Sequence, residues 1–177
     1  MGVNVTIVPE TTLMFHSAGM LARDGRCKTL DSSSDGYVRG ESCAGVVMSS
    51  NSGEGSAGLS QTISVVVCGT AVNQDGRSSS LTAPNGPAQQ GVMRAAVRQA
   101  GGTTVVHSLQ MHGTGTALGD PIEVGATSAV LGTQDSTLVL SAGKTCIGHT
   151  EPAAGISGIV HAMTAMSSAT AHPLLHL

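Results

Sequence analysis

The chain has 177 residues, 40% of them apolar, and a formal net charge of −3 with only 8 Lys and Arg residues. So few basic residues argue against a nucleic-acid-binding surface, and no apolar run reaches the roughly 18 to 20 residues of a membrane-spanning helix. The N-terminus also lacks the charged-then-apolar layout of a signal peptide. We therefore expect a soluble, cytoplasmic protein made of one ordinary domain or of part of a larger one.

The sequence is very poor in aromatic residues and rich in glycine. The sequence holds one Tyr, one Phe and no Trp, but 24 Gly. We expect a core of Val, Ile, Leu, Met and Ala in which glycines allow close backbone approach. The cysteines Cys27, Cys43, Cys68 and Cys146 show neither CxxC spacing nor a histidine at the distance of a metal finger, so reduced thiols and no metal site are expected.

The first part of the chain predicts strands, a helix and loops. Residues 3–8 are β-branched and end at a proline, which is typical of a strand interior to a sheet. Residues 10–28 predict a short helix and a loop. Residues 30–40 predict a loop rich in Ser, Asp and Gly, next to which Arg39 and Glu41 are close enough to pair.

The middle of the chain predicts a hairpin and then a helix. Residues 42–49 and 63–68 have strand patterns joined by a turn of Gly and Ser, which favours an antiparallel pair. Residues 69–86 are polar and glycine-bearing, and they form either a surface loop or a functional loop near a site. Residues 87–100 predict an amphipathic helix, with Gly101 just after its end.

A histidine then follows a strand and precedes a helix. Residues 103–111 predict a buried strand that stops near His112. The next helix has Asp120 as a natural N-cap, Pro121 at its first position and Glu123 where a capping box needs it.

The same arrangement comes a second time. Residues 137–142 predict a strand, and His149 precedes a helix that opens at Glu151 and Pro152. Parallel strands joined by a helical crossover end at the same edge of a sheet, so we expect His112 and His149 to converge there. Two neutral imidazoles aimed at one point suit a reaction that develops negative charge on a carbonyl oxygen. The other histidines are interpreted as structural, namely His16, His107, His161, His172 and His176.

Several motifs together carry a family resemblance. They are HGTGT at residues 112–116, GDPIE at 119–123 and KTCIGH at 144–149, with DGRCK at 24–28, DGYVRGE at 35–41 and GTAVNQDGR at 69–77. Over nearly the whole chain this combination resembles the downstream portion of a β-ketoacyl synthase, specifically the ketosynthase domain of modular-type polyketide synthases. The resemblance implies a partial, thiolase-like α/β fold of layered helices and mixed sheets. Residues 1–86 would end its N-terminal half, and residues 87–177 would form an incomplete C-terminal half.

The implied reaction is a decarboxylative Claisen condensation in polyketide or fatty-acid biosynthesis. A malonyl-type thioester on acyl carrier protein loses CO2, and its enolate attacks an acyl thioester. By resemblance His112 and His149 are the catalytic residues that stabilise the enolate, and Lys144 sets the local electrostatics. Thr114 and Thr116 would bind the phosphopantetheine arm.

By the same resemblance Glu151 supports the site by joining the Lys144 network. Simpler interpretations exist for these residues. Lys144 would be a solvated charge at the end of a strand, Glu151 a carboxylate at a helix N-terminus, and the two threonines loop hydroxyls that satisfy backbone groups. The family also implies a homodimer, acyl carrier protein as partner, and no cofactor bound directly, because the substrates ride on the carrier's phosphopantetheine.

The family's nucleophile is a cysteine in a run resembling Thr-Ala-Cys-Ser-Ser, which in the family's order lies upstream of Met1. None of the four cysteines here stands in such a run. We therefore expect this sequence to be a portion of a longer domain, without its nucleophile and its final strands. The alternatives are a non-catalytic thiolase-like partner or scaffold and, less favoured because no G-x-S-x-G elbow is present, a serine hydrolase.

Overall fold

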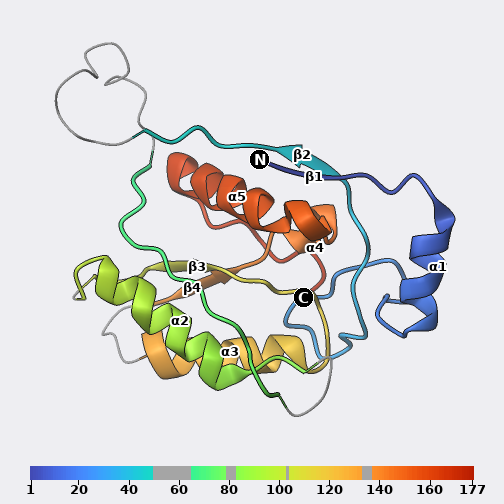
Figure 1. Ribbon diagram of the computed structural model, residues 1–177, viewed down its shortest axis with the longest axis horizontal. Helices are drawn as coiled ribbons and strands as arrows, with labels where there is room; N and C mark the ends of the chain where they lie inside the picture. The colour runs from blue at the N-terminus through green and yellow to red at the C-terminus, as the bar shows by residue number, and fades with distance from the viewer. Residues whose placement is uncertain (50–64, 79–82, 103, 133–136) are drawn as a thin grey trace.

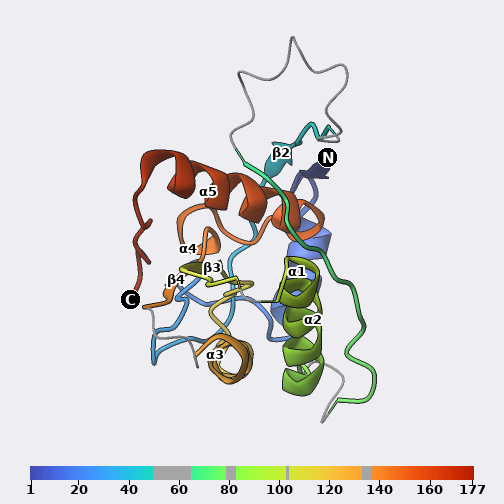
Figure 2. The same cartoon turned by 90° about the vertical axis from the view of Figure 1, so that its left-hand side faces the viewer.

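The computed structural model describes residues 1–49, 65–78, 83–102, 104–132 and 137–177 (Figure 1). The elements in chain order are β1 (Gly2–Asn4), α1 (Pro9–Ser17), β2 (Ser42–Ala44), α2 (Gly86–Gln99), β3 (Ser108–Gln110), α3 (Gly119–Leu131), β4 (Val139–Ser141), α4 (Lys144–Ile147), η1 (Glu151–Ala153) and α5 (Ala154–Ser168). Helix α5 lies on one side of β3 and β4, and the packed pair α2 and α3 lies on the other side (Figures 1 and 2). Within the described ranges, no helix is both long and apolar enough to cross a membrane.

Strands β3 and β4 form the parallel pair that the sequence predicts. Ser108 lies opposite Val139, and Gln110 lies opposite Ser141, with α3 as the crossover between the strands. The backbone N–H of Met111 donates to the carbonyl of Ser141 at 2.8 Å, which extends the pairing to the edge of the site. Both strands are shorter than their apolar runs, but their C-terminal ends lie at one edge, as predicted.

The start of α3 differs from the predicted capping box. The helix begins at Gly119, so Asp120 is not its N-cap, and the carboxylate of Asp120 instead accepts hydrogen bonds from the amides of Leu30 at 2.9 Å and Gly115 at 3.2 Å. Glu123 likewise turns to the preceding loop rather than to the helix start. Tight loops expose unpaired amides, and these two carboxylates satisfy them.

The N-terminal strands pair differently from the predicted hairpin. Strand β2 lies antiparallel to β1, with Val3 opposite Cys43. Residues 65–68 form no strand, and residues 63 and 64 lie outside the described part. Strand β1 has β2 as its one neighbour in a two-stranded sheet, and Val3 is 44% exposed, so it is not interior among the described residues. Pairing with a strand already present at residues 2–4 replaces the local hairpin.

The helix predicted at residues 87–100 is confirmed as α2. Asn85 caps it, because its side-chain oxygen accepts from the N–H of Ala88 at 3.2 Å, and Gly101 follows its end at φ 109°. The final helix opens at Glu151 as predicted, first as the 3-10 turn η1 and then as α5. Helix α4 was not predicted, because its residues follow a strand directly and show no helical apolar period.

The buried core is poorer in branched side chains than the sequence predicts. Its apolar members are Ala22, Cys27, Tyr37, Ala83, Met111, Ala126, Leu131, Ala142 and Ala153. Among the described residues no Val or Ile is buried to this degree, and several are strongly exposed, such as Ile7 at 82%. The loops around the site approach each other at backbone distance, which leaves room for Ala and Gly but not for larger side chains.

Gly115 should tolerate no side chain. Its φ is 76°, and a Cβ built there would lie 2.7 Å from the backbone nitrogen of Lys28, so Gly115→Ala is expected to lower the free energy of unfolding by about 2 kcal/mol. Gly125 in α3 is the matched control, since nothing lies within 4 Å of its Cβ position. Gly125→Ala should raise the free energy of unfolding by about 0.5–1 kcal/mol, because alanine favours the helix more than glycine does. Urea denaturation measures both, and equal effects would contradict the assigned backbone contact.

Candidate functional site

The two predicted histidines converge at the shared edge of β3 and β4. The ring centres of His112 and His149 lie 5.5 Å apart, with the ring planes at 87° to each other. A single oxygen atom between them is within reach of both rings, because an N–H···O hydrogen bond spans about 2.9 Å. The predicted convergence is confirmed by this geometry.

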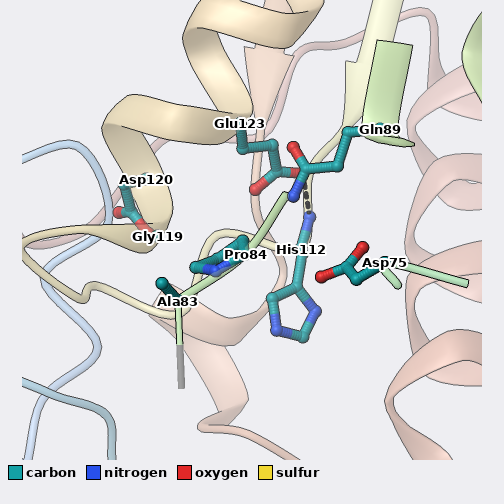
Figure 3. A pocket seen from close by; sticks show the side chains of 8 residues that line it. All are labelled: Asp75, Ala83, Pro84, Gln89, His112, Gly119, Asp120 and Glu123. Atoms are coloured by element: carbon teal, nitrogen blue, oxygen red, sulfur yellow. Dashed lines mark hydrogen bonds between the residues drawn. The ribbon is translucent and has the colours of Figure 1, made fainter. Parts of the chain in front are cut away.

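His112 faces a cavity of about 310 Å³ whose polar wall includes Asp75, Gln89 and Glu123. Figure 3 shows its imidazole directed away from Glu123, between Asp75 and Pro84 in that view. The segment at residues 69–86, for which the sequence left two interpretations, therefore contributes to the wall of this cavity. Asp75 belongs to the GTAVNQDGR motif but was not among the predicted site residues, and no sequence pattern indicated Gln89.

Glu123 and Lys144 hold the backbone around His112. The carboxylate of Glu123 accepts from the N–H of His112 at 2.6 Å and from that of Gly113 at 2.9 Å. The ammonium of Lys144 donates to the carbonyl of His112 at 2.6 Å. On the other side, the Thr29 hydroxyl donates to the carbonyl of Gly113 at 2.8 Å. The histidine thus sits in a loop whose amides and carbonyls are fixed from three directions.

The His149 loop is fixed by the segment around Arg39. The N–H of His149 donates to the carbonyl of Val38 at 2.7 Å, and the N–H of Gly40 donates to the carbonyl of His149 at 2.9 Å. A Cβ at Gly40 would collide with the carbonyl of Ile147, so only glycine permits this approach. Tyr37 meets the His149 ring edge to face with ring centres 5.1 Å apart.

A backbone amide sets the tautomer of His149. The N–H of Glu151 donates to Nδ1 of His149 at 3.0 Å. A neutral imidazole that accepts at Nδ1 carries its proton on Nε2. Burial, and next the charges of Lys144 and His112, lower the pKa of His149 from 6.5 to about 4. At neutral pH His149 is therefore an uncharged Nε2–H donor.

His112 and Lys144 are both shifted toward their neutral forms. His112 is exposed at the mouth of the cavity, yet the surrounding protein removes part of the water around its ring, and this desolvation lowers its pKa. The positive charge of Lys144 lowers the pKa further. The half-buried position of Lys144 lowers the pKa of its ammonium, while Glu123 opposes this. Two uncharged imidazoles beside a partly desolvated cation form a site that stabilises a developing oxyanion.

The two threonines of the first loop lie next to each other. The hydroxyls of Thr114 and Thr116 are 3.4 Å apart, and the Thr116 hydroxyl accepts from the N–H of Gly119 at 3.2 Å. Thr114 is 7% exposed. Their role toward a substrate arm stays a prediction, and the simpler function of satisfying a loop amide is visible for Thr116.

The predicted partners of Arg39 and Glu151 are wrong. The guanidinium of Arg39 donates through Nε and Nη2 to the two carboxylate oxygens of Glu151, at 2.6 and 3.0 Å. Glu151 was expected to join the Lys144 network. Glu41, the expected partner of Arg39, instead accepts from the amide and hydroxyl of Thr6 at 2.7 and 2.6 Å. These pairings link segments far apart in sequence, which local spacing does not reveal.

Cys27 does not resemble an activated nucleophile. Cys27 is 1% exposed, its thiol lies 3.3 Å from the N–H of Val38, and burial raises its pKa. A raised pKa disfavours the thiolate that nucleophilic attack requires. In the described part of the chain, no three His, Cys, Asp or Glu side chains are arranged to hold a metal ion.

The pKa of His149 predicts a pH dependence of stability. A histidine of the unfolded chain titrates near 6.5, so between about pH 6.5 and about pH 4 the unfolded chain binds a proton that folded His149 does not bind. The free energy of unfolding should therefore fall as pH falls through this window. The His149→Gln variant should show a shallower fall, as measured by urea denaturation from pH 7 to pH 4. Identical slopes in the two proteins would contradict the assigned environment.

Sequence comparisons agree with this site. Residues 64–177 match the family described as Beta-ketoacyl synthase, C-terminal domain, and residues 1–53 match Beta-ketoacyl synthase, N-terminal domain. One phenolphthiocerol/phthiocerol polyketide synthase subunit of Mycobacterium tuberculosis (strain CDC 1551 / Oshkosh) is 44% identical over 99% of this chain and 11% of that protein. Another subunit of the same synthase and strain is 42% identical over 99% of this chain and 9% of that protein.

Solved structures agree as well. The ketosynthase from module 6 of the bacillaene synthase of Bacillus subtilis 168 matches with a TM-score of 0.85 at 30% identity, over 99% of this chain and 32% of that one. The oxazolomycin ketosynthase domain OzmH KS7 of Streptomyces albus JA3453 matches with a TM-score of 0.83 at 29% identity, over 98% and 31%. The chain thus spans about a tenth of the curated relatives and about a third of the solved ketosynthases. The predicted thiolase-like fold is confirmed, and the chain belongs to the β-ketoacyl synthase family of condensing enzymes.

Proposed function

We propose that this chain supplies the histidine-bearing part of a ketosynthase that catalyses decarboxylative Claisen condensation in polyketide biosynthesis. The observation that carries the proposal is the convergence of two uncharged imidazoles, 5.5 Å apart, on one point at the sheet edge. A malonyl-type thioester bound there loses CO2, and the electron pair of the broken C–C bond moves toward the thioester carbonyl. The resulting enolate oxygen accepts hydrogen bonds from His112 and from Nε2 of His149.

The enolate carbon then attacks an acyl thioester, and a cysteine thiolate leaves as the new C–C bond forms. We assign that cysteine to the whole protein rather than to Cys27, whose thiol is buried and paired with Val38. Lys144 assists by keeping both imidazoles neutral, since its charge lowers the pKa of His112 and of His149. No cofactor enters these steps.

The substrates and partners follow from the same proposal. A malonyl-type unit would arrive on the phosphopantetheine of an acyl carrier protein, with Thr114 and Thr116 as hydrogen-bonding residues for the arm. The whole protein would act as a homodimer in the cytoplasm. A fatty-acid parent involves the same chemistry, and polyketide synthesis is favoured because the relatives described above are polyketide synthase subunits.

Loss of His112 should abolish most decarboxylation. In the intact natural protein, His112→Ala is expected to slow CO2 release from malonyl acyl carrier protein by roughly 10²–10³-fold, because one oxyanion donor is lost. The exposed His107, which precedes β3, gives the control His107→Ala, expected to stay within about twofold. Retained decarboxylation in the His112→Ala variant would contradict the role of His112 as an oxyanion donor. An intact wild type that releases no CO2 but binds a complete ketosynthase would favour the non-catalytic partner instead.

The threonine assignment has its own test. Thr114→Val keeps the shape of a side chain that is 7% exposed but removes one hydroxyl, so KM for the malonyl carrier should rise about 2- to 10-fold with little change in kcat. Steady-state kinetics on the intact protein measure the two constants separately. A fall in kcat at constant KM would instead point to a structural role of this hydroxyl through its contact with Thr116.

A further inference from the structure

Arg39 is held more tightly than a surface arginine. Its side chain is 9% exposed, and two of its nitrogens donate to the carboxylate of Glu151. The third nitrogen donates to the Thr12 hydroxyl at 2.8 Å, and the guanidinium carbon lies 5.3 Å from the centre of the Phe15 ring. Helix α1 therefore fixes one face of the guanidinium while Glu151 occupies its fork.

Glu151 is held in a backbone conformation that it would not adopt alone. Its φ is 45°, in the left-handed region that side chains with a Cβ avoid, and Pro152 follows it. The same residue provides the N–H that donates to Nδ1 of His149. A residue in a disfavoured backbone conformation needs a compensating contact elsewhere. The ion pair with Arg39, 112 positions away in sequence, supplies such a contact for Glu151.

The ion pair and the histidine belong to one local assembly. Arg39 and His149 form a parallel bridge, in which His149 pairs with Val38 and Gly40, the residues on both sides of Arg39. The backbone pairing fixes the main chain at His149, and the carbonyl of Glu151 accepts from the N–H of Ala154 at the end of η1. The ion pair with Arg39 additionally fixes the side chain of Glu151.

We propose that Arg39 is a positioning residue of the site: through Glu151 it holds the amide N–H against Nδ1 of His149 and so keeps this imidazole in the Nε2–H tautomer. This inference rests on the proposed function, in which Nε2–H donates to the enolate oxygen. If the amide turned away, the proton would also populate Nδ1, and Nε2 would then present a lone pair to that oxygen. A neutral acceptor at this place does not stabilise the enolate.

The tautomer can be measured directly. In the intact natural protein labelled with ¹⁵N-histidine, the His149 ring signals, identified by their loss in His149→Gln, should show a pyrrole-type Nε2 and a pyridine-type Nδ1. Arg39→Gln should mix the two tautomers and lower malonyl decarboxylation by about 10-fold or more. Arg98→Gln, at an exposed position of α2, is the matched control and should change neither.

A glycine variant separates positioning from general stability. Glu151→Gly also lacks the ion pair, but glycine accepts a φ of 45° without strain, so it should retain more of the Nε2–H tautomer than Glu151→Ala. In the Glu151→Gly background, Arg39→Gln should have no further effect on the ring signals. If Arg39→Gln does not fold, as judged by circular dichroism, the Gly and Ala variants of Glu151 still decide the matter. Equal tautomer populations in those two variants overturn the inference.

The same measurements separate the positioning role of Arg39 from the proposed function. A wild type with a locked Nε2–H tautomer but no decarboxylation would refute the function and leave the positioning role in place. An active wild type whose tautomer and rate survive Arg39→Gln would refute the positioning role and leave the function in place.

Discussion

The parallel pairing of β3 with β4 is the constraint on which the site depends. Because α3 returns the chain so that both strands run in the same direction, the residues after each strand emerge at one edge. His112 follows β3 after one residue, and His149 follows β4 after the short helix α4. Without this pairing, the two loops would not place the imidazoles of His112 and His149 next to each other. The remaining contacts adjust the positions of two loops that the sheet already holds close together.

The carboxylates near the site are used in a way that keeps the histidines neutral. Glu123 accepts from two backbone amides, Asp120 accepts from two others, and Glu151 is paired with Arg39. A carboxylate bound directly to an imidazole would raise the pKa of that imidazole, which suits a general base and not a donor that stays uncharged. Here Asp120 and Glu151 oppose only weakly the effects of desolvation and of Lys144. The result is a pair of donors that remain uncharged at neutral pH.

The sequence predicted the features that depend on local period and on strand direction. The helix at α2, the parallel pair and the convergence of His112 with His149 all follow from apolar patterns and from the geometry of a crossover. The capping box at Asp120 failed because nearby loop amides compete for the same carboxylates. The hairpin after β2 failed because β1, distant in sequence, is its partner.

Other features were out of reach for a different reason. The pairing of Arg39 with Glu151 joins positions 112 residues apart, and no local sequence pattern predicts the φ of 45° at Glu151. A spacing rule offered Glu41 as the partner of Arg39, since it is the nearest carboxylate in sequence. Tyr37, the only Tyr of the chain, lies in the same DGYVRGE motif as Arg39 and contacts the His149 ring. A single Tyr inside this motif was the sequence feature that could have pointed to the segment as part of the site.

The central claim is that His112 and His149 donate together to one oxygen of the substrate. The most direct measurement is a crystal structure of the intact natural protein with a malonyl pantetheine in which an amide replaces the thioester, so that the ligand resists decarboxylation. The account predicts the amide carbonyl oxygen between the two rings, about 2.9 Å from Nε2 of His149 and within the same distance of a His112 ring nitrogen. A carbonyl oxygen bound by other groups, with the two imidazoles facing solvent, would contradict it.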